Sequence, residues 1–206
     1  MHTEILTKKQ KELLPLISKF NKDFVLVGGT AIALYIGHRY SIDFDLFSFQ
    51  KIKRKQIKNT IINNDFFADN VIYEAFDQMH LIVNDIKLTF FQFPHKIKGV
   101  NEFNEIIKIP DLLSLAAMKA YALGGRAKWK DYVDLYFILK YHYSFEQISE
   151  KATEIFDTFF NTKLFKEQLS YFKDIDYTEE VTYLSNNPPS EKEIQDFLTE
   201  KALSEF

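Results

Sequence analysis

Residues 28–48 read GGTAIALYIGHRYSIDFDLFS, and this stretch decides the fold. The residues just before it, 24–27, form an apolar run that is typical of a buried strand. The run ends at Gly28-Gly29, where a chain can turn sharply, and residues 30–36 are apolar and free of helix breakers. The stretch therefore predicts a buried strand, a tight glycine turn and a helix.

A second strand is predicted at residues 41–47, where polar and apolar side chains alternate with a period of two. A strand places Asp43 and Asp45 on one face, with their Cα atoms about 6.5–7 Å apart. Two such charges at about 4 Å repel by roughly 4 kcal/mol at an effective dielectric constant near 20, and a bound cation relieves this cost. Oxygen ligands in a chain without cysteine favour Mg²⁺ or Mn²⁺. A solvated polar face is the alternative, but the neighbours Ile42 and Phe44 indicate a central strand.

Gly28, Gly29 and Thr30 form the candidate phosphate-binding turn. Two glycines let backbone N–H groups approach a ligand closely, and the first turn of a helix offers unpaired donors and a partial positive charge. An ordinary strand-to-helix turn is the alternative. Arg39 and Ser41 complete the predicted nucleotide-binding residues of this stretch. Arg39 either holds a phosphate or pairs with one of the two acids, and Ser41 also suits a local hydrogen bond to the backbone.

Together, the turn and the acidic pair resemble the signature of the polymerase-β-type nucleotidyltransferase superfamily, in which a Gly-Gly or Gly-Ser turn precedes Asp-x-Asp. More narrowly, the stretch is similar to the AbiEii/AbiGii toxin family, whose members often carry Gly-Gly-Thr, His-Arg and Ser-x-Asp-Phe-Asp in this order. A second block, residues 119–136, reads KAYALGGRAKWKDYVDLY and resembles a recurrent pattern of that family. The resemblance covers residues 25–140 and implies that Asp43 and Asp45 hold the metal.

The second block adds charged candidates from a predicted helical region. Lys119 lies in an otherwise apolar run, where it either extends to the surface or, as the resemblance implies, contacts nucleotide phosphates. Arg126 and Lys130 are expected to offset the charge that shifts onto the leaving pyrophosphate. Asp131 and Asp134 share a helix face and either accept a proton, pair with the lysine or bridge to Lys130. Lys119 and Asp131 are the candidates for catalysis from this block.

One position departs from the superfamily pattern, which usually has a third carboxylate on a later strand. The matching strand, residues 86–91, offers Thr89 there, and a hydroxyl cannot supply the negative charge of a carboxylate ligand. Either Asp131 substitutes for the missing acid, or metal binding is weakened and activity is in question.

The order of elements predicts an α+β fold. A mixed sheet forms a nucleotidyltransferase core at residues 1–108, and a mainly helical region at 109–206 completes the active-site cleft. Asn84-Asp85 is the expected turn between two strands, and Ser190 with Glu193 forms a predicted capping box before the last helix. The further predicted elements are helices at 8–20, 51–63, 112–123, 128–141, 145–159 and 163–172, and strands at 71–83 and 86–93.

The composition is that of an ordinary globular protein, with 46% hydrophobic and 27% charged residues in a chain of 206. The absence of cysteine from the sequence excludes disulfides, thiolate metal sites and cysteine nucleophiles. A net charge of −3 gives no overall attraction to nucleic acid, although the lysine-rich segment 51–58 suits either an RNA backbone or solvent. The sequence has neither a signal-peptide pattern nor an apolar run that spans a bilayer, so we expect a cytoplasmic protein without a membrane partner.

The resemblance implies an enzyme that transfers NMP from an NTP to an acceptor with Mg²⁺ or Mn²⁺, as a toxin-like component of a toxin–antitoxin or phage-defence system. It suggests tRNA as an acceptor and an antitoxin protein as a partner. Two alternatives stay open. One is a catalytically degraded nucleotide- or protein-binding module, which the missing third acid motivates. The other is a nucleotidyltransferase that acts on a protein or a small molecule.

Overall fold

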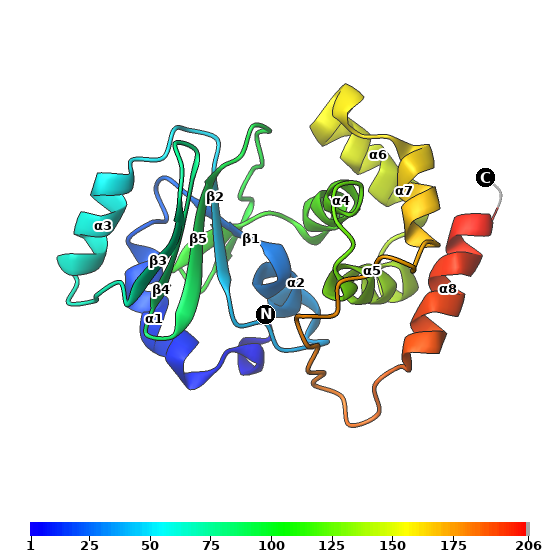
Figure 1. Cartoon of the computed structure of the whole chain (residues 1–206), viewed down its shortest axis with the longest axis horizontal. Helices are drawn as coiled ribbons and strands as arrows, with labels where there is room; N and C mark the ends of the chain where they lie inside the picture. Colours follow the sequence, from blue (N-terminus) through cyan, green and yellow to red (C-terminus); the bar gives the residue numbers. More distant parts are fainter. Residues whose placement is uncertain (205–206) are drawn as a thin grey trace. The chain divides into compact units, whose positions relative to one another are not determined.

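The computed structural model describes residues 1–204 and confirms the predicted α+β class. It contains two compact units, Met1–Asp111 and a second that begins at Leu112. The first unit holds a five-stranded mixed sheet with helices, and the second holds the later helices of the chain (Figure 1). Residue 108, the expected boundary, lies inside strand β7 (Ile107–Ile109).

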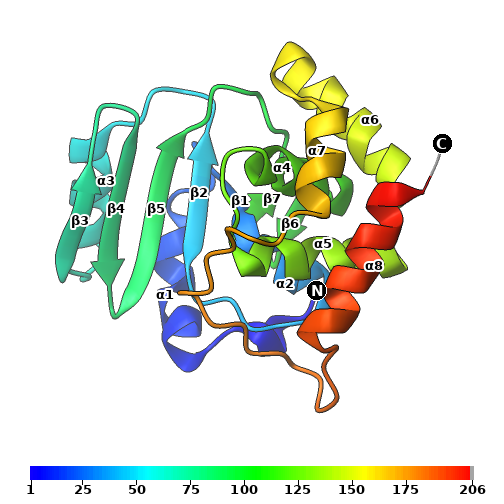
Figure 2. The same cartoon turned by 45° about the vertical axis from the view of Figure 1, so that its right-hand side comes forward.

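The sheet of the first unit has the strand order β1-β2-β5-β4-β3, which can be followed from right to left in Figure 2. Strand β2 pairs in parallel with β5, while the other neighbours run antiparallel. β2 therefore has a hydrogen-bonded neighbour on each side, as expected for a central strand. The strand bounds are β1 Val25–Val27, β2 Phe44–Ser48, β3 Asn70–Glu74, β4 Gln78–Val83 and β5 Ile86–Gln92.

One face of this sheet is the hydrophobic core. Leu46 of β2 and Phe90 of β5 are fully buried on it, and Phe20 packs edge-on against Phe90 with ring centroids 4.8 Å apart. Helices α1 (Lys8–Ser18) and α3 (Arg54–Ile62) cover this face (Figure 1). The period-two alternation of β2 sends Phe44 and Leu46 into the core and directs Asp45 to the opposite face, which it shares with Phe47.

Helix α2 (Gly28–Ile36) follows β1 as predicted, but it begins at Gly28 instead of residue 30, so the two glycines form its first turn. Gly28 has a φ of +74°, a conformation that L side chains adopt only with strain. Gly37 ends the helix with a φ of +63°, which is the usual left-handed C-terminal glycine.

The prediction of one strand at 71–83 was wrong, because the chain forms two strands there. β3 and β4 are separated by a short turn, which Ala75 closes by donating its backbone N–H to the carbonyl of Gln78 at 2.8 Å. The turn residues 75–77 contain neither glycine nor proline, so the sequence offered no strong signal for a break. The turn predicted at Asn84-Asp85 is confirmed, since both residues have positive φ angles, 52° and 60°, as primed hairpin turns require.

One strand boundary differs from the prediction, and one small hairpin was missed. Strand β2 starts at Phe44, so Ser41 and Asp43 precede it instead of lying within a strand that starts at residue 41. A small hairpin of β6 (Asn101–Phe103) and β7 was not predicted, because three-residue strands carry too little alternation to detect.

The second unit contains five α-helices among its described residues. Ser190 caps the last of them by accepting from the backbone N–H of Glu193 at 3.1 Å, as predicted. The reciprocal half of the capping box was wrong, because the Glu193 carboxylate accepts from Tyr136 Oη at 2.5 Å and Lys140 Nζ at 2.9 Å instead.

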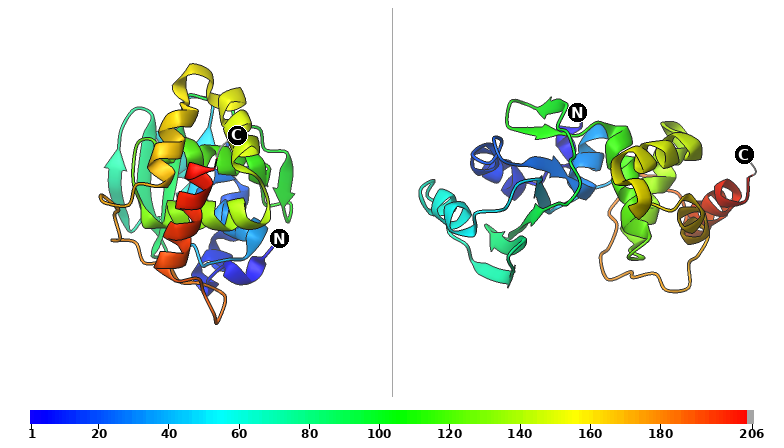
Figure 3. Two further views of the ribbon diagram at one scale, coloured as in Figure 1. Left: turned by 90° about the vertical axis from the view of Figure 1, so that its right-hand side faces the viewer. Right: turned by 90° about the horizontal axis from the view of Figure 1, so that it is seen from above.

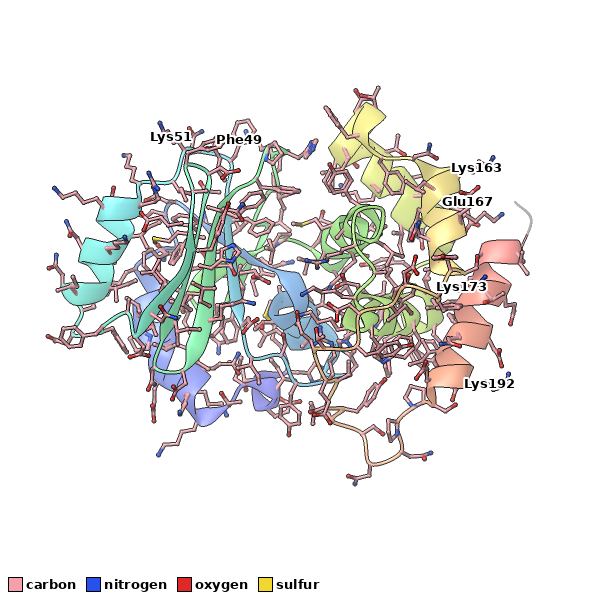
Figure 4. All side chains as sticks on the ribbon, viewed as in Figure 1. Phe49, Lys51, Lys163, Glu167, Lys173 and Lys192 are labelled. Carbon is pink, nitrogen blue, oxygen red and sulfur yellow. The ribbon has the colours of Figure 1, made fainter. Side chains whose placement is uncertain are left out.

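The helices of the second unit expose charged side chains, and Lys163, Glu167 and Lys192 point away from their helices (Figure 4). The helix bounds are α4 Leu112–Leu123, α5 Trp129–Tyr141, α6 Phe145–Phe156, α7 Thr162–Leu169 and α8 Glu191–Leu203. Short 3-10 helices lie at η1 Thr3–Ile5 in the first unit and at η2 Asp157–Phe159 in the second.

None of the helices within residues 1–204 combines the length and the apolar character needed to cross a membrane.

Candidate functional site

The glycine turn lies directly against Asp45. Asp45 pairs in register with Val27, the last residue of β1, and its carboxylate reaches the start of α2. A Cβ atom on Gly28 would lie only 2.2 Å from Asp45 Oδ2. The missing side chain at Gly28 therefore creates the space in which this carboxylate sits beside the first turn of the helix.

Thr30 ties the segment before β2 to helix α2. Its side chain is buried, its hydroxyl donates to the backbone carbonyl of Asp43, and Ser41 Oγ lies 3.0 Å away. The buried Gln10 of α1 adds a second tether, donating from Nε2 to the Ser41 carbonyl at 2.8 Å. Thr30 uses its one hydroxyl proton on the backbone, so it positions Asp43, and its predicted contact with a phosphate stays a prediction.

The position of Arg39 gives the reason that residue 29 is a glycine. Its side chain is buried, and its Nη1 donates to the Tyr40 carbonyl at 2.9 Å. A Cβ atom on Gly29 would lie 2.5 Å from Arg39 Nη2 and 3.0 Å from Ser41 Oγ. The guanidinium is therefore held against the start of α2, where it adds positive charge to the helix N-terminus.

Lys87 is a neighbour of the acidic pair that the sequence analysis did not select. Its Nζ lies 2.8 Å from Asp43 Oδ2. Lys87 belongs to β5, which pairs with β2 in the parallel register Phe44 with Leu88. The signal was in the sequence, because Lys87 stands two residues before Thr89 in an alternating strand and so shares its face.

The register also shows what stands beside Asp45. Thr89 of β5 is its cross-strand partner, and His80 of β4 is the partner of Thr89 on the other side. Asp43 and Asp45 lie on this face too, since they meet Lys87 and Thr89, respectively. Burial lowers the pKa of His80, Lys87 lowers it further, and Asp45 opposes both, so the pKa stays below its usual 6.5.

The donor set of this face fits a hard divalent cation. Within residues 1–204, no group of three or more His, Cys, Asp or Glu side chains is arranged to hold a metal ion. Mg²⁺ does not need such a cage, since it often binds through one or two carboxylates and completes its shell with water and substrate phosphates. Asp43 and Asp45 would be the protein ligands, with the nucleotide supplying the rest.

Lys119 is the centre of a charged cluster inside the second unit. Lys119 of α4 is buried, and its Nζ contacts Asp131 and lies 2.9 Å from Asp134 Oδ2, both on α5. Arg126 Nε adds a second cation 2.8 Å from Asp131 Oδ2. Of the three roles considered for the two acids, the structure shows pairing with Lys119. The predicted contacts of Lys119 and Arg126 with phosphates stay predictions.

Charge compensation sets the ionisation of Asp131. Burial alone would raise its pKa, but the charges and hydrogen bonds of Lys119 and Arg126 outweigh burial and hold the pKa below its usual value. The carboxylate is therefore ionised near neutral pH. Its lone pairs are already directed at two cations, which makes the cluster a structural centre of the helical unit.

Lys130 contacts Glu179, which the sequence analysis did not select. Glu179 lies in the extended connection between α7 and α8, drawn in orange in Figures 2 and 3, and its carboxylate contacts both Lys128 and Lys130. Burial would raise the pKa of Glu179, but the two lysines lower it to about 2. No sequence signal marks Glu179, because it lies far along the chain from its partners.

The fold and this face together define a class of protein. A mixed sheet with a glycine turn after its first strand and two acids at the start of the next is the core of a nucleotidyltransferase. Two solved structures share the fold. JHP933 from Helicobacter pylori is 19% identical with a TM-score of 0.61, covering 96% of this chain and 91% of that one. MenT4, a nucleotidyltransferase toxin from Mycobacterium tuberculosis H37Rv, is 14% identical with a TM-score of 0.63, covering 94% of this chain and 80% of that one.

Sequence comparison gives the family. A family model described as nucleotidyl transferase AbiEii toxin, type IV TA system, matches residues 16–68, which include the turn and both acids. An uncharacterized protein of Aquifex aeolicus (strain VF5) is 30% identical over 141 residues, which is 66% of this chain and 68% of that protein. The chain belongs to the AbiEii nucleotidyltransferase toxin family, as the sequence resemblance predicted.

Proposed function

We propose that this chain transfers a nucleoside monophosphate from an NTP to an acceptor hydroxyl, with Asp43 and Asp45 as the ligands of Mg²⁺. One observation carries the proposal: the Asp45 carboxylate lies against Gly28 at the start of α2, beside Asp43. This arrangement offers a cation site next to backbone donors that suit phosphate oxygens.

The chain's own residues would act mainly by positioning. The first turn of α2 and the buried Arg39 attract the triphosphate, and Thr30 fixes the segment that carries Asp43. The acceptor oxygen then forms a bond to the α-phosphorus as the bond to the leaving pyrophosphate breaks, and the hydroxyl proton passes to solvent. A bound Mg²⁺ supplies charge neutralisation for the phosphate oxygens.

Membership of a toxin family supports the finer parts of the proposal. We infer a toxin that acts with an antitoxin partner, and tRNA is the first acceptor to test. The test incubates each α-labelled NTP with the chain and Mg²⁺ in three reactions that contain tRNA, cell-lysate protein or small-molecule acceptors. We expect label on tRNA, and none with EDTA.

Asp45→Asn is the matched inactive variant, because it keeps the shape of the side chain and removes the charge. We expect a loss of at least about a hundredfold in transfer, comparable with the loss of a principal charge-stabilising group. Label on lysate protein or a small molecule would change the acceptor but keep the enzyme class.

A catalytically degraded module is the second candidate, and the presence of Thr89 beside Asp45 favours it. A module would bind NTP equally well with EDTA and with Mg²⁺, and Asp45→Asn would not change that binding. Isothermal titration of a non-hydrolysable NTP under both conditions separates the two candidates.

A further inference from the structure

The contact between Lys87 and Asp43 brings a fixed cation into the acidic pair. The Lys87 Nζ to Asp43 Oδ2 distance is 2.8 Å, and both side chains are about one-third exposed, at 34% and 31%. A nucleotide and a divalent ion can therefore reach the pair from solvent. The Lys87 ammonium group already lies beside the Asp43 carboxylate, whose negative charge has to be neutralised.

The lysine is held by the sheet and not by a loop. Lys87 is the residue before Leu88 in β5, and the parallel register pairs Leu88 with Phe44 and Thr89 with Asp45. Period-two alternation then directs Lys87 and Thr89 to the same face. One strand thus places an ammonium next to the first acid and a neutral hydroxyl next to the second.

Strand β5 therefore carries a positive and a neutral side chain on this face, where the superfamily pattern has a carboxylate. A third carboxylate beside Asp45 would bring the formal charge of the acids to −3, which a single divalent ion leaves negative. Thr89 adds no charge, and Lys87 reduces the formal charge of the two acids from −2 to −1. One divalent ion is then enough to reverse the sign of the site.

We propose that Lys87 is a positioning residue that acts through Asp43 and takes the place of one of two cations, so that the chain binds its nucleotide with a single divalent ion. The inference rests on the proposed function, because it concerns the same site. It also accounts for Thr89: a site that uses one divalent ion has no need for a third carboxylate.

The test counts and titrates Mn²⁺ by electron paramagnetic resonance and isothermal titration. We expect wild-type protein to bind one Mn²⁺ per chain in the presence of a non-hydrolysable NTP. Lys87→Gln removes the competing charge, so Mn²⁺ affinity without nucleotide should rise by about tenfold or more. Lys87→Arg retains the charge and should keep the wild-type affinity. Two Mn²⁺ per wild-type chain, or an unchanged affinity in Lys87→Gln, would overturn the inference.

Lys9→Gln is the matched control, because Lys9 also pairs with an aspartate, Asp85, in the same unit but at the β4–β5 turn. It removes the same charge and should leave Mn²⁺ binding unchanged. Thermal unfolding of each variant checks that the fold is intact. Failure of wild-type protein to transfer NMP to any acceptor would defeat the proposed function, whereas the ion count and the Lys87→Gln titration would still decide the role of Lys87.

Discussion

Gly28 meets two requirements that no other residue type meets together. Its positive φ starts helix α2 directly after β1, and its missing Cβ leaves room for the Asp45 carboxylate. Sequence reasoning assigned the glycine to phosphate binding. The structure adds that the residue also positions the acid, so the turn and the metal ligands form one arrangement.

Gly28→Ala should therefore impair metal binding more than folding. The positive φ costs the variant about 1–2 kcal/mol in stability, and the new Cβ, 2.2 Å from Asp45 Oδ2, must displace the carboxylate. We expect Mn²⁺ affinity to fall by about tenfold or more, measured by isothermal titration. Gly125→Ala is the control, because the contact of its Cβ would be an ordinary 3.8 Å. Wild-type affinity in Gly28→Ala would contradict this account.

Lys119 gives a prediction about stability. It is the common partner of two fully buried carboxylates, so its removal leaves both charges without their shared cation. We expect Lys119→Met to lower the free energy of unfolding by about 3–5 kcal/mol, as for a broken buried ion pair. Urea denaturation followed by circular dichroism measures this change.

Lys163→Met provides the comparison for Lys119→Met. Lys163 forms an exposed helical pair with Glu167, with 3.9 Å between their charged atoms. Such pairs contribute little, so its unfolding curve should nearly overlay that of wild type. Equal losses of unfolding free energy in the two variants would show that burial does not determine how much Lys119 contributes to stability.

The segment between α2 and β2 is placed by the elements around it. Residues 41–43 precede the strand, and Thr30 of α2 and Gln10 of α1 hold their carbonyl groups. The position of Asp43 is therefore decided by helix contacts as well as by strand pairing. This dependence is the reason that the predicted strand began too early.

Thr30→Val tests that placement with little change in shape. The variant removes the hydroxyl that binds the Asp43 carbonyl, and it should cost about 1–3 kcal/mol because a buried acceptor loses its partner. Mn²⁺ affinity should also fall. Thr30→Ser keeps the hydroxyl and should recover most of the affinity, if not all of the packing. A loss of stability without any loss of Mn²⁺ affinity would separate the tether from the site.

The connection between α7 and α8 ties distant parts of the helical unit together. The backbone carbonyl of Asp176 accepts from the backbone N–H of Trp129 at 3.0 Å, and the Glu179 carboxylate contacts Lys128 and Lys130. These contacts secure the start of α5, the helix that carries Asp131. The connection thus supports the helix that carries two acids of the buried cluster.

Glu179 should make the stability of the chain depend on pH in the acid range. Its pKa is depressed from 4.5 to about 2, so its stabilisation is complete above about pH 4.5 and is lost as the pH falls towards 2. The side chain is partly exposed, so the effect is smaller than the shift alone suggests. Glu179→Gln should flatten this part of the profile, measured by urea denaturation from pH 5 to 3. Glu150→Gln on the exposed side of α6 is the control, and an equally steep profile in Glu179→Gln would refute the assignment.

Local sequence determined the elements and the class of this protein. The apolar run, the two glycines and the alternation around Asp43 and Asp45 act over a few residues, so they predict the turn, the central strand and the family from the chain alone. The same signals failed at the turn near Ala75, which has neither glycine nor proline, and where strands were only three residues long.

Tertiary structure alone decided which charges meet. Lys87 reaches Asp43 through the parallel pairing of β2 and β5, and Glu179 reaches Lys130 across 49 positions of sequence. Lys119 has both helical acids as partners, although the sequence left three roles open for them. A charged residue in the sequence does not indicate which opposite charge it will contact. Only the packing of distant segments brings a cation and a carboxylate within bonding distance.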